Sequence, residues 1–249
     1  MRQLEIAEGG LPLLFFQGGY GRFSPSSLAA SDQHGQLTLQ LQLVDRARPQ
    51  MEALAAELSA VCVASARIGN EVVVIASAGQ PRSHAPATLV GQRLPFIPPT
   101  GSVFAAWMDD AAVARWADDP GDPERAQACR DALARVRERG YSVGLINEAR
   151  RAFVAKLYER STGPSETEQA VLGALIKDLA YDPAALDRET SAAVRIISAP
   201  VFDARGKVAF ALTLHDFTKP SSPEDVARLA RRLLDSTVAV SDLLPGKRA

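Results

Sequence analysis

The chain has few residues of the kinds that mark secreted, metal-binding or membrane-spanning proteins. Only two cysteines occur among 249 residues, Cys62 and Cys129, and they lack the spacing of a metal site or a CxxC motif. We expect both to be small buried side chains in a reducing cytoplasm. No apolar run approaches the roughly 18 residues of a membrane span, and the apolar stretch 11–16 is too short for a signal sequence. These absences predict a soluble, cytoplasmic protein without a membrane partner.

Charge of one sign is also lacking. Twenty-eight basic residues against 29 acidic ones leave a formal net charge of -1, so no general field attracts the chain to nucleic acid. Any contact with DNA would have to come from a local basic patch. With 47% hydrophobic and 23% charged residues, the chain can bury an ordinary globular core.

Motifs of catalysis and metal binding are absent as well. The three histidines, His34, His84 and His215, show no ligand spacing, and the sequence contains no GxSxG, HExxH or phosphate-binding loop. His215 precedes Asp216, but adjacent residues of a strand face opposite sides of the sheet, so the two side chains do not converge. We therefore expect no enzyme activity, no catalytic residue, no metal and no cofactor, and we interpret His215 as a polar contact in a pocket.

Hydrophobic periodicity and turn residues predict an α+β fold. Strands are expected in two hairpins, with helices before, between and after them, which favours an antiparallel sheet flanked by helices. The expected hairpins span residues 61–77 and 192–214, with further strands at 89–94 and 141–145. Helices are expected at 37–58, 102–117, 123–139, 148–160, 165–179 and 222–244. Pro49 is expected to kink the first helix or divide it in two, and Val226, Leu229, Leu233, Val238 and Leu243 are expected along the buried side of the last one.

The first 36 residues form a separate segment in this interpretation. Residues 11–17 and 20–23 read as a short hairpin around Gly18 and Gly19, preceded by the end of a helix. This arrangement is compatible with a DNA-binding wing or with a plain hairpin packed on the main domain.

Several segments, in order, resemble the effector-binding domain of IclR-type transcription regulators. They are Gly91-Gln92-Arg93-Leu94-Pro95, Gly101-Ser102-Val103-Phe104-Ala105-Ala106-Trp107, Arg139-Gly140-Tyr141-Ser142-Val143 and the hairpin from Arg195 to Asp203 and Gly206 to Leu214. The terminal helix matches too, so the resemblance covers about residues 40–245. It implies a GAF-like fold in residues 37–249, with extra helices at 148–190 that could cover a pocket or build an interface.

The resemblance also implies a pocket for a small, often carboxylate-bearing molecule. Its predicted ligand-binding residues here are Pro99, Thr100, Gly101, Ser102, Val103, Phe104, Gly144, Ile196, Thr213 and His215. The N–H groups at the start of the helix at Ser102 could bind an anion; alternatively Thr100 or Ser102 caps its own helix. Gly144 and Ile196 stand where the family commonly has an acidic residue and a cysteine, and Thr213 and His215 where it often has serines. These replacements imply a larger or more apolar ligand, or none.

Complete regulators of this family carry an N-terminal winged helix-turn-helix of about 60–70 residues, for which residues 1–36 are too few. At most this segment contains the end of a recognition helix, with Arg2, and a wing, with Arg22. Either the DNA-binding part is truncated or it has been lost. The leading hypothesis is a ligand-responsive transcription regulator, acting as a homodimer or homotetramer. The alternative is a stand-alone GAF-like sensor that works through protein contacts.

Overall fold

The computed structural model describes residues 31–81, 90–119, 121–148, 152, 171, 174–176, 179 and 182–244, with side chains from residue 43 onward. The expected N-terminal hairpin, with Arg2 and Arg22, therefore lies outside the described residues, as do His84 and most of the expected helices 148–160 and 165–179.

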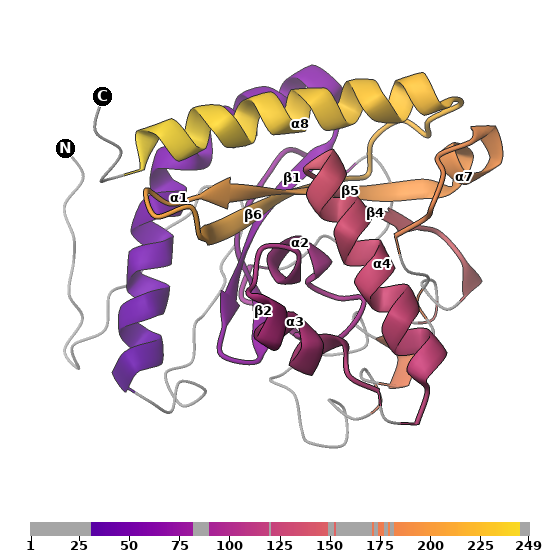
Figure 1. Ribbon diagram of the computed structural model, residues 1–249. Coiled ribbons are helices and arrows are strands. Elements are labelled where there is room, and N and C mark those ends of the chain that lie inside the picture. Colours follow the sequence, from indigo (N-terminus) through magenta and orange to yellow (C-terminus); the bar gives the residue numbers. More distant parts are fainter. Residues whose placement is uncertain are drawn as a thin grey trace, which may run out of the picture.

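A single long helix, α1 (Ser31–Leu58), opens the described part of the chain. It passes through Pro49 without being divided, so of the two outcomes expected at this proline the division is wrong. Figure 1 shows α1 changing direction along its length, so that its later part lies beside the last helix, α8 (Pro223–Leu243). A bend of this kind is the usual effect of a proline inside a helix, because the ring removes one backbone hydrogen bond.

The sheet has six antiparallel strands. They are β1 (Val61–Ile68), β2 (Glu71–Ala78), β3 (Arg93–Pro95), β4 (Ser142–Leu145), β5 (Val194–Phe202) and β6 (Val208–His215). Their order across the sheet is β3-β2-β1-β6-β5-β4, and every neighbouring pair is antiparallel. Both expected hairpins are confirmed. The strand expected at 89–94 instead begins at Arg93, because residues 90 and 91 form a turn.

Helices cover both faces of this sheet, as expected for the predicted α+β fold (Figure 1). One face packs against α1 and α8, and this layer holds the main core. Its largest fully buried side chains include Phe210, Leu212, Leu214, Ile197, Ile75, Met51, Leu54 and Leu233. The core residues of β5 and β6 alternate along each strand, so the residues between them face the other side.

The other face carries the helices α2 (Ser102–Ala105), α3 (Asp110–Ala117) and α4 (Pro123–Arg139). The single helix expected over residues 102–117 is thus wrong. Asp109 accepts a hydrogen bond from the N–H of Ala112 at 2.8 Å and starts a new helix, which separates α3 from α2. The expected helix 123–139 is confirmed, and it ends at Gly140.

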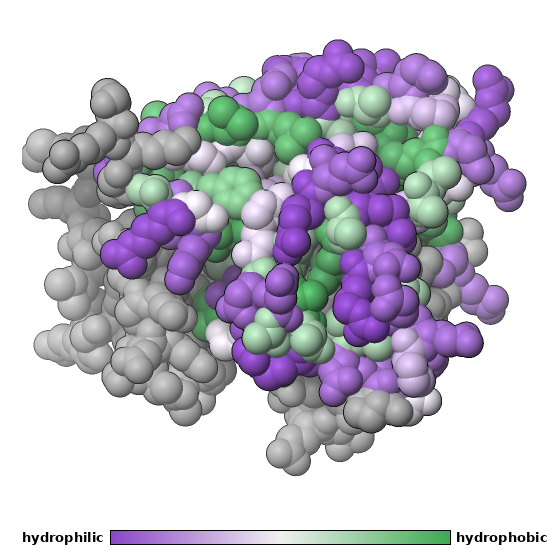
Figure 2. Space-filling view, viewed as in Figure 1, coloured by the Kyte–Doolittle hydropathy of each residue, from purple (hydrophilic) through white to green (hydrophobic). Residues whose placement is uncertain are grey.

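The final helix begins close to its expected start, after the Ser222 cap, but two of its expected core residues are wrong. Val238 and Leu243 are 60% and 49% exposed, while Thr237 and Val240 are buried. The buried stripe follows the 3.6-residue repeat from Val226 more closely than the apolar residues alone suggested. Figure 2 shows hydrophilic residues along the outer side of α8 and over α4. A short helix, α7 (Arg188–Ala193), leads into β5.

In the part of the chain that the structure describes, no helix is long and apolar enough to cross a membrane.

Candidate ligand-binding site

The sheet brings three of the predicted site residues, Gly144, Ile196 and His215, into one row. Gly144 of β4 pairs with Ile196 of β5, Ile196 pairs with His215 of β6, and His215 pairs with Val61 of β1. These residues alternate with the core residues of their strands, so they lie on the face opposite α1 and α8. Ile196 and His215 are half-buried. The three predicted residues of the row lie between positions 144 and 215 of the chain, and the antiparallel register brings them together.

The next row on the same face contains a pair of hydroxyl groups. Thr213 pairs with Ser198 on one side and with Val63 on the other. The hydroxyl oxygens of Ser198 and Thr213 are 2.9 Å apart, so either can donate to the other. Ser198 is 8% exposed, and Val63, on the other side of Thr213, is 4% exposed. A hydroxyl pair beside buried apolar side chains is a short polar strip, able to donate or accept a hydrogen bond from a ligand.

His215 contributes a polar group with little charge at neutral pH. Burial lowers the pKa of His215 below its ordinary value of 6.5, and the carboxylate of Asp216 raises it by a smaller amount. A neutral imidazole offers one donor and one acceptor nitrogen.

The remaining predicted residues, 99–104, lie on the same side of the sheet. Val103 and Phe104 of α2 share a buried cluster with Ala211, which precedes Thr213 by two residues in β6. The expectation that Thr100 or Ser102 caps the helix is wrong, and an anion at the helix start stays a prediction. The N–H of Ser102 donates to the carbonyl of Pro99 at 3.2 Å, and its hydroxyl donates to the same oxygen at 2.6 Å. Ser102 therefore neither presents a free N–H nor caps its own helix, and Gly101 occupies the cap position with no side-chain bond.

A buried ionic cluster supports the edge of the sheet next to this row. Asp182 is 5% exposed; one of its carboxylate oxygens forms an ion pair with Arg139, and the other accepts a hydrogen bond from the N–H of Val143 at 2.9 Å. Arg135 donates to the carbonyl oxygen of Asp182 at 2.8 Å. These contacts fix the start of β4, and thereby Gly144, against the end of α4.

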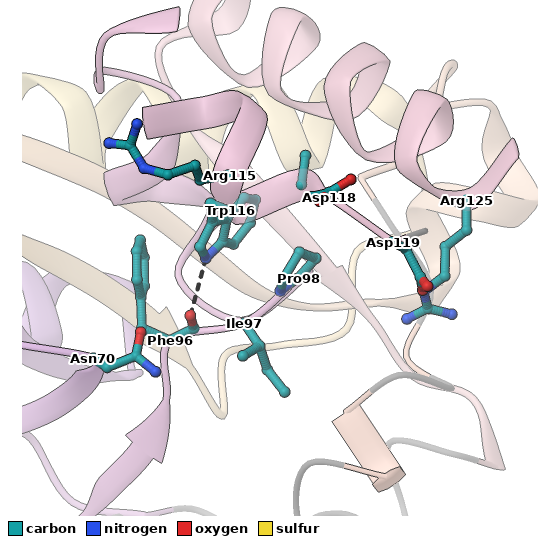
Figure 3. A pocket seen from close by; sticks show the side chains of 10 residues that line it. Asn70, Phe96, Ile97, Pro98, Arg115, Trp116, Asp118, Asp119 and Arg125 are labelled. Carbon is teal, nitrogen blue, oxygen red and sulfur yellow. Dashed lines mark hydrogen bonds and ion pairs between the residues drawn. The ribbon is translucent and has the colours of Figure 1, made fainter. Parts of the chain in front are cut away.

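A cleft elsewhere on the molecule contains none of the ten predicted ligand-binding residues. Its volume is about 460 Å³, and it opens between the segment after β3 and the end of α3 (Figure 3). Its lining residues are Asn70, Phe96, Ile97, Pro98, Arg115, Trp116, Ala117, Asp118, Asp119 and Arg125. They come from four separate stretches of sequence, and no spacing motif connects them.

Sequence reasoning missed Ser198 and Ser65 on the sheet face, and the whole Phe96–Trp116 cleft. Strand alternation could have found Ser198, because it follows Ile196 by two residues. Ser65 is buried and pairs with Ala211, in the row beyond the hydroxyl pair. Among the described residues, no group of three or more histidine, cysteine or acidic side chains could hold a metal ion.

The comparisons with known proteins address the fold. No family model and no curated protein matches the sequence. Solved structures do match, among them an IclR transcriptional regulator from Alicyclobacillus acidocaldarius, 22% identical over 80% of this chain and 67% of that one, with a TM-score of 0.51.

The C-terminal domain of the E. coli transcriptional regulator KdgR is 20% identical and aligns with 82% of this chain and 99% of that chain, with a TM-score of 0.50. This chain has the fold of an IclR-type effector-binding domain. The Thermotoga maritima IclR, with a TM-score of 0.55 and 13% identity over 86% of this chain and 74% of that one, has it too. The expected fold is thereby confirmed.

Proposed function

We propose that residues 37–249 are the effector-binding domain of a ligand-responsive transcription regulator and that they bind a small organic molecule on the sheet face opposite α1 and α8. The observation that carries this proposal is the group of polar side chains formed by Ser198, Thr213 and His215 beside the buried apolar Val61 and Val63. The fold, which the chain shares with IclR-type transcriptional regulators, supports the same function.

The proposed contacts determine which ligands fit. Ile196, Val103 and Phe104 offer apolar surface, and Thr213 and His215 offer hydrogen bonds. None of the ten proposed ligand-binding residues carries a formal charge at neutral pH, since burial keeps His215 mostly neutral by lowering its pKa. A carboxylate would therefore depend on hydroxyl and backbone N–H donors alone. We expect a mainly apolar molecule with one or two hydrogen-bonding groups.

Ligand screening by thermal unfolding tests this proposal. A molecule that binds only the folded state must raise the midpoint, by an amount that grows with its concentration. Small carboxylic acids, their amides and aromatic alcohols form the first panel. Thr213→Val keeps the side-chain volume and removes the hydroxyl, so it should reduce the shift. Thr218→Val, at an exposed position after β6, is the matched control. If a ligand shifts the midpoint equally in the wild type and in Thr213→Val, the result argues against a site on the sheet face.

DNA binding belongs to residues 1–36 in this proposal, through Arg2 and Arg22. Mobility-shift assays with DNA from around the protein's own gene, with and without a ligand found by screening, provide the test. We propose further that the protein acts as a homodimer or homotetramer and has no enzymatic activity. Light scattering after size-exclusion chromatography measures the oligomeric state. Recovery of the bound ligand unchanged after a binding titration supports the absence of enzymatic activity.

A second candidate function is a sensor that acts through protein contacts. The near-neutral charge, 28 basic against 29 acidic residues, favours it, because no general electrostatic attraction to DNA assists binding. The two candidates share the same ligand site. They differ in the mobility-shift assay, where the sensor gives no retarded DNA at any ligand concentration.

A further inference from the structure

The cleft beside Trp116 is continuous with a second, smaller hollow. The smaller one has a volume of about 230 Å³ and shares Asn70, Phe96, Arg115 and Trp116 with the larger. Together they form a surface cleft on the helix-covered side of the β1–β2 turn. Its combined size is within the range of small-molecule sites, which are commonly about 300–1,000 Å³.

Aromatic and proline side chains form the wall between the two ends. The rings of Phe96 and Trp116 are 5.4 Å apart and inclined by 33°. The indole N–H of Trp116 donates to the carbonyl of Phe96 at 3.1 Å, which uses the one polar group of that ring. What Trp116 offers the cleft is therefore its apolar ring, next to Pro98 (Figure 3). A planar apolar ligand would match this wall.

The two ends of the cleft differ in charge. Arg67 and Arg115 line the smaller hollow, which has no acidic lining residue. The guanidinium of Arg67 lies over the Phe96 ring at 4.4 Å from its centroid and donates to the carbonyl of Gly69 and the sulfur of Met108. Desolvation by burial lowers the pKa of Arg67. Within the described residues, neither Arg67 nor Arg115 forms an ion pair with a carboxylate.

Acidic residues occupy only the opposite end. Asp118 and Asp119 lie there, and Asp119 is 3.8 Å from the guanidinium of Arg125, so their charges largely offset each other. Figure 3 shows Asn70, Phe96 and Arg115 on one side of Trp116 and the Asp119–Arg125 pair on the other. An anionic group of a ligand is therefore stabilised most at the end of the cleft that Arg67 and Arg115 line.

We propose that this cleft is a second ligand site, separate from the sheet face, and that it binds a planar aromatic carboxylate. The ring lies against Trp116 and Pro98, and the carboxylate lies at the end of the cleft that Asn70, Arg67 and Arg115 line. In this proposal the two arginines favour a negatively charged ligand, and the aromatic wall favours a planar one.

Benzoate is the probe, and benzamide, which has nearly the same shape but no charge, is its control. The chain has two tryptophans, so the Trp107→Phe variant leaves Trp116 as the only indole emitter. Benzoate should change the Trp116 emission saturably, and calorimetry should give a matching affinity with about one equivalent bound. Benzamide should bind at least about tenfold more weakly, because it cannot form charge-assisted hydrogen bonds with the two arginines.

Arg115→Ala and Arg67→Met should each weaken benzoate binding roughly tenfold, and the Arg228→Ala variant should leave it unchanged. Arg115 is exposed and Arg228, on α8, has a 68% exposed side chain, so neither change threatens folding. Equal binding of benzoate and benzamide, no saturable binding of benzoate, or equal effects of Arg115→Ala and Arg228→Ala would each overturn the proposal.

Thr213→Val distinguishes this site from the sheet face. If benzoate occupies the cleft beside Trp116, Thr213→Val leaves its affinity unchanged. If Thr213→Val abolishes binding and Arg115→Ala does not, benzoate binds on the sheet face instead; the second site is then wrong, although the proposed function gains support.

Discussion

The hydroxyl oxygens of Ser198 in β5 and Thr213 in β6 are 2.9 Å apart, on the face of the sheet opposite α1 and α8. Their neighbours on that face, Val61 and Val63, are apolar and buried. In such surroundings the two hydroxyls hydrogen-bond to each other when no ligand is present. When a ligand binds, either hydroxyl can rotate and hydrogen-bond to the ligand instead. This is the feature on which the proposed sensing function depends.

The first prediction concerns the coupling of this pair. Thr213→Val should lower the free energy of unfolding by about 1 kcal/mol, because it leaves the Ser198 hydroxyl without its partner. Ser198→Ala should have a similar effect, and the double variant should be less destabilised than the sum of the two. Urea denaturation of the four proteins measures this. Strictly additive losses would show that the two hydroxyls do not stabilise each other.

A second prediction follows from the lowered pKa of His215. The unfolded chain binds a proton near pH 6.5, whereas the folded chain binds it only at lower pH, so folding is favoured above this range. Stability contributed by the neutral imidazole is present above pH 6.5 and is lost as the pH falls through the folded pKa. The melting temperature of the wild type should therefore fall between pH 7 and pH 5 more steeply than that of His215→Gln. Parallel curves for the two proteins would contradict the buried, neutral state.

Gly101 gives a third prediction. Its φ of +89° lies in the left-handed region, and a Cβ there would be 2.5 Å from Cδ2 of Phe96. Gly101→Ala should cost more than about 2 kcal/mol, since it adds a steric clash to the backbone strain. Gly206→Ala is the matched control, with φ +72° and nothing within 4 Å of the added carbon, and should cost about 1 kcal/mol. Equal losses in chemical denaturation would mean that Phe96 moves aside freely.

The buried ion pair of Asp182 and Arg139 supplies a fourth. Asp182→Ala should lower the free energy of unfolding by about 3 kcal/mol, because it leaves a largely buried guanidinium and the Val143 N–H without their acceptor. Asp235→Ala removes an exposed partner of Arg232 and should change stability little. If the two changes lower the free energy of unfolding equally in urea, the buried ion pair of Asp182 stabilises the fold no more than an exposed one.

Local signals in the sequence were sufficient for most of the fold. The hairpin at 61–77, the helix at 123–139 and the start of the last helix near residue 222 each depend on neighbouring residues, and all three lie close to where the sequence predicts them. The break before α3 was missed, because it depends on Asp109 capping a helix inside an apolar pattern. The exposed Val238 was missed because hydrophobicity alone does not determine which face of a helix is buried.

The sites depend on distant contacts, and here the sequence was less informative. Thr213 and His215 were found through a family resemblance, and the register of β5 and β6 then added Ser198. The cleft beside Trp116 joins a turn, a loop and two helices whose residues lie up to 55 positions apart, from Asn70 to Arg125. No periodicity connects such positions; only the packing of α3 against the loop after β3 brings them together.

The most direct test of the central claim is a thermal-shift titration of the wild type and Thr213→Val with the best ligand from the screening panel. The account predicts a midpoint that rises with ligand concentration in the wild type and a clearly smaller rise in Thr213→Val, with Thr218→Val behaving as the wild type. An identical rise in all three proteins would contradict a ligand site on the sheet face.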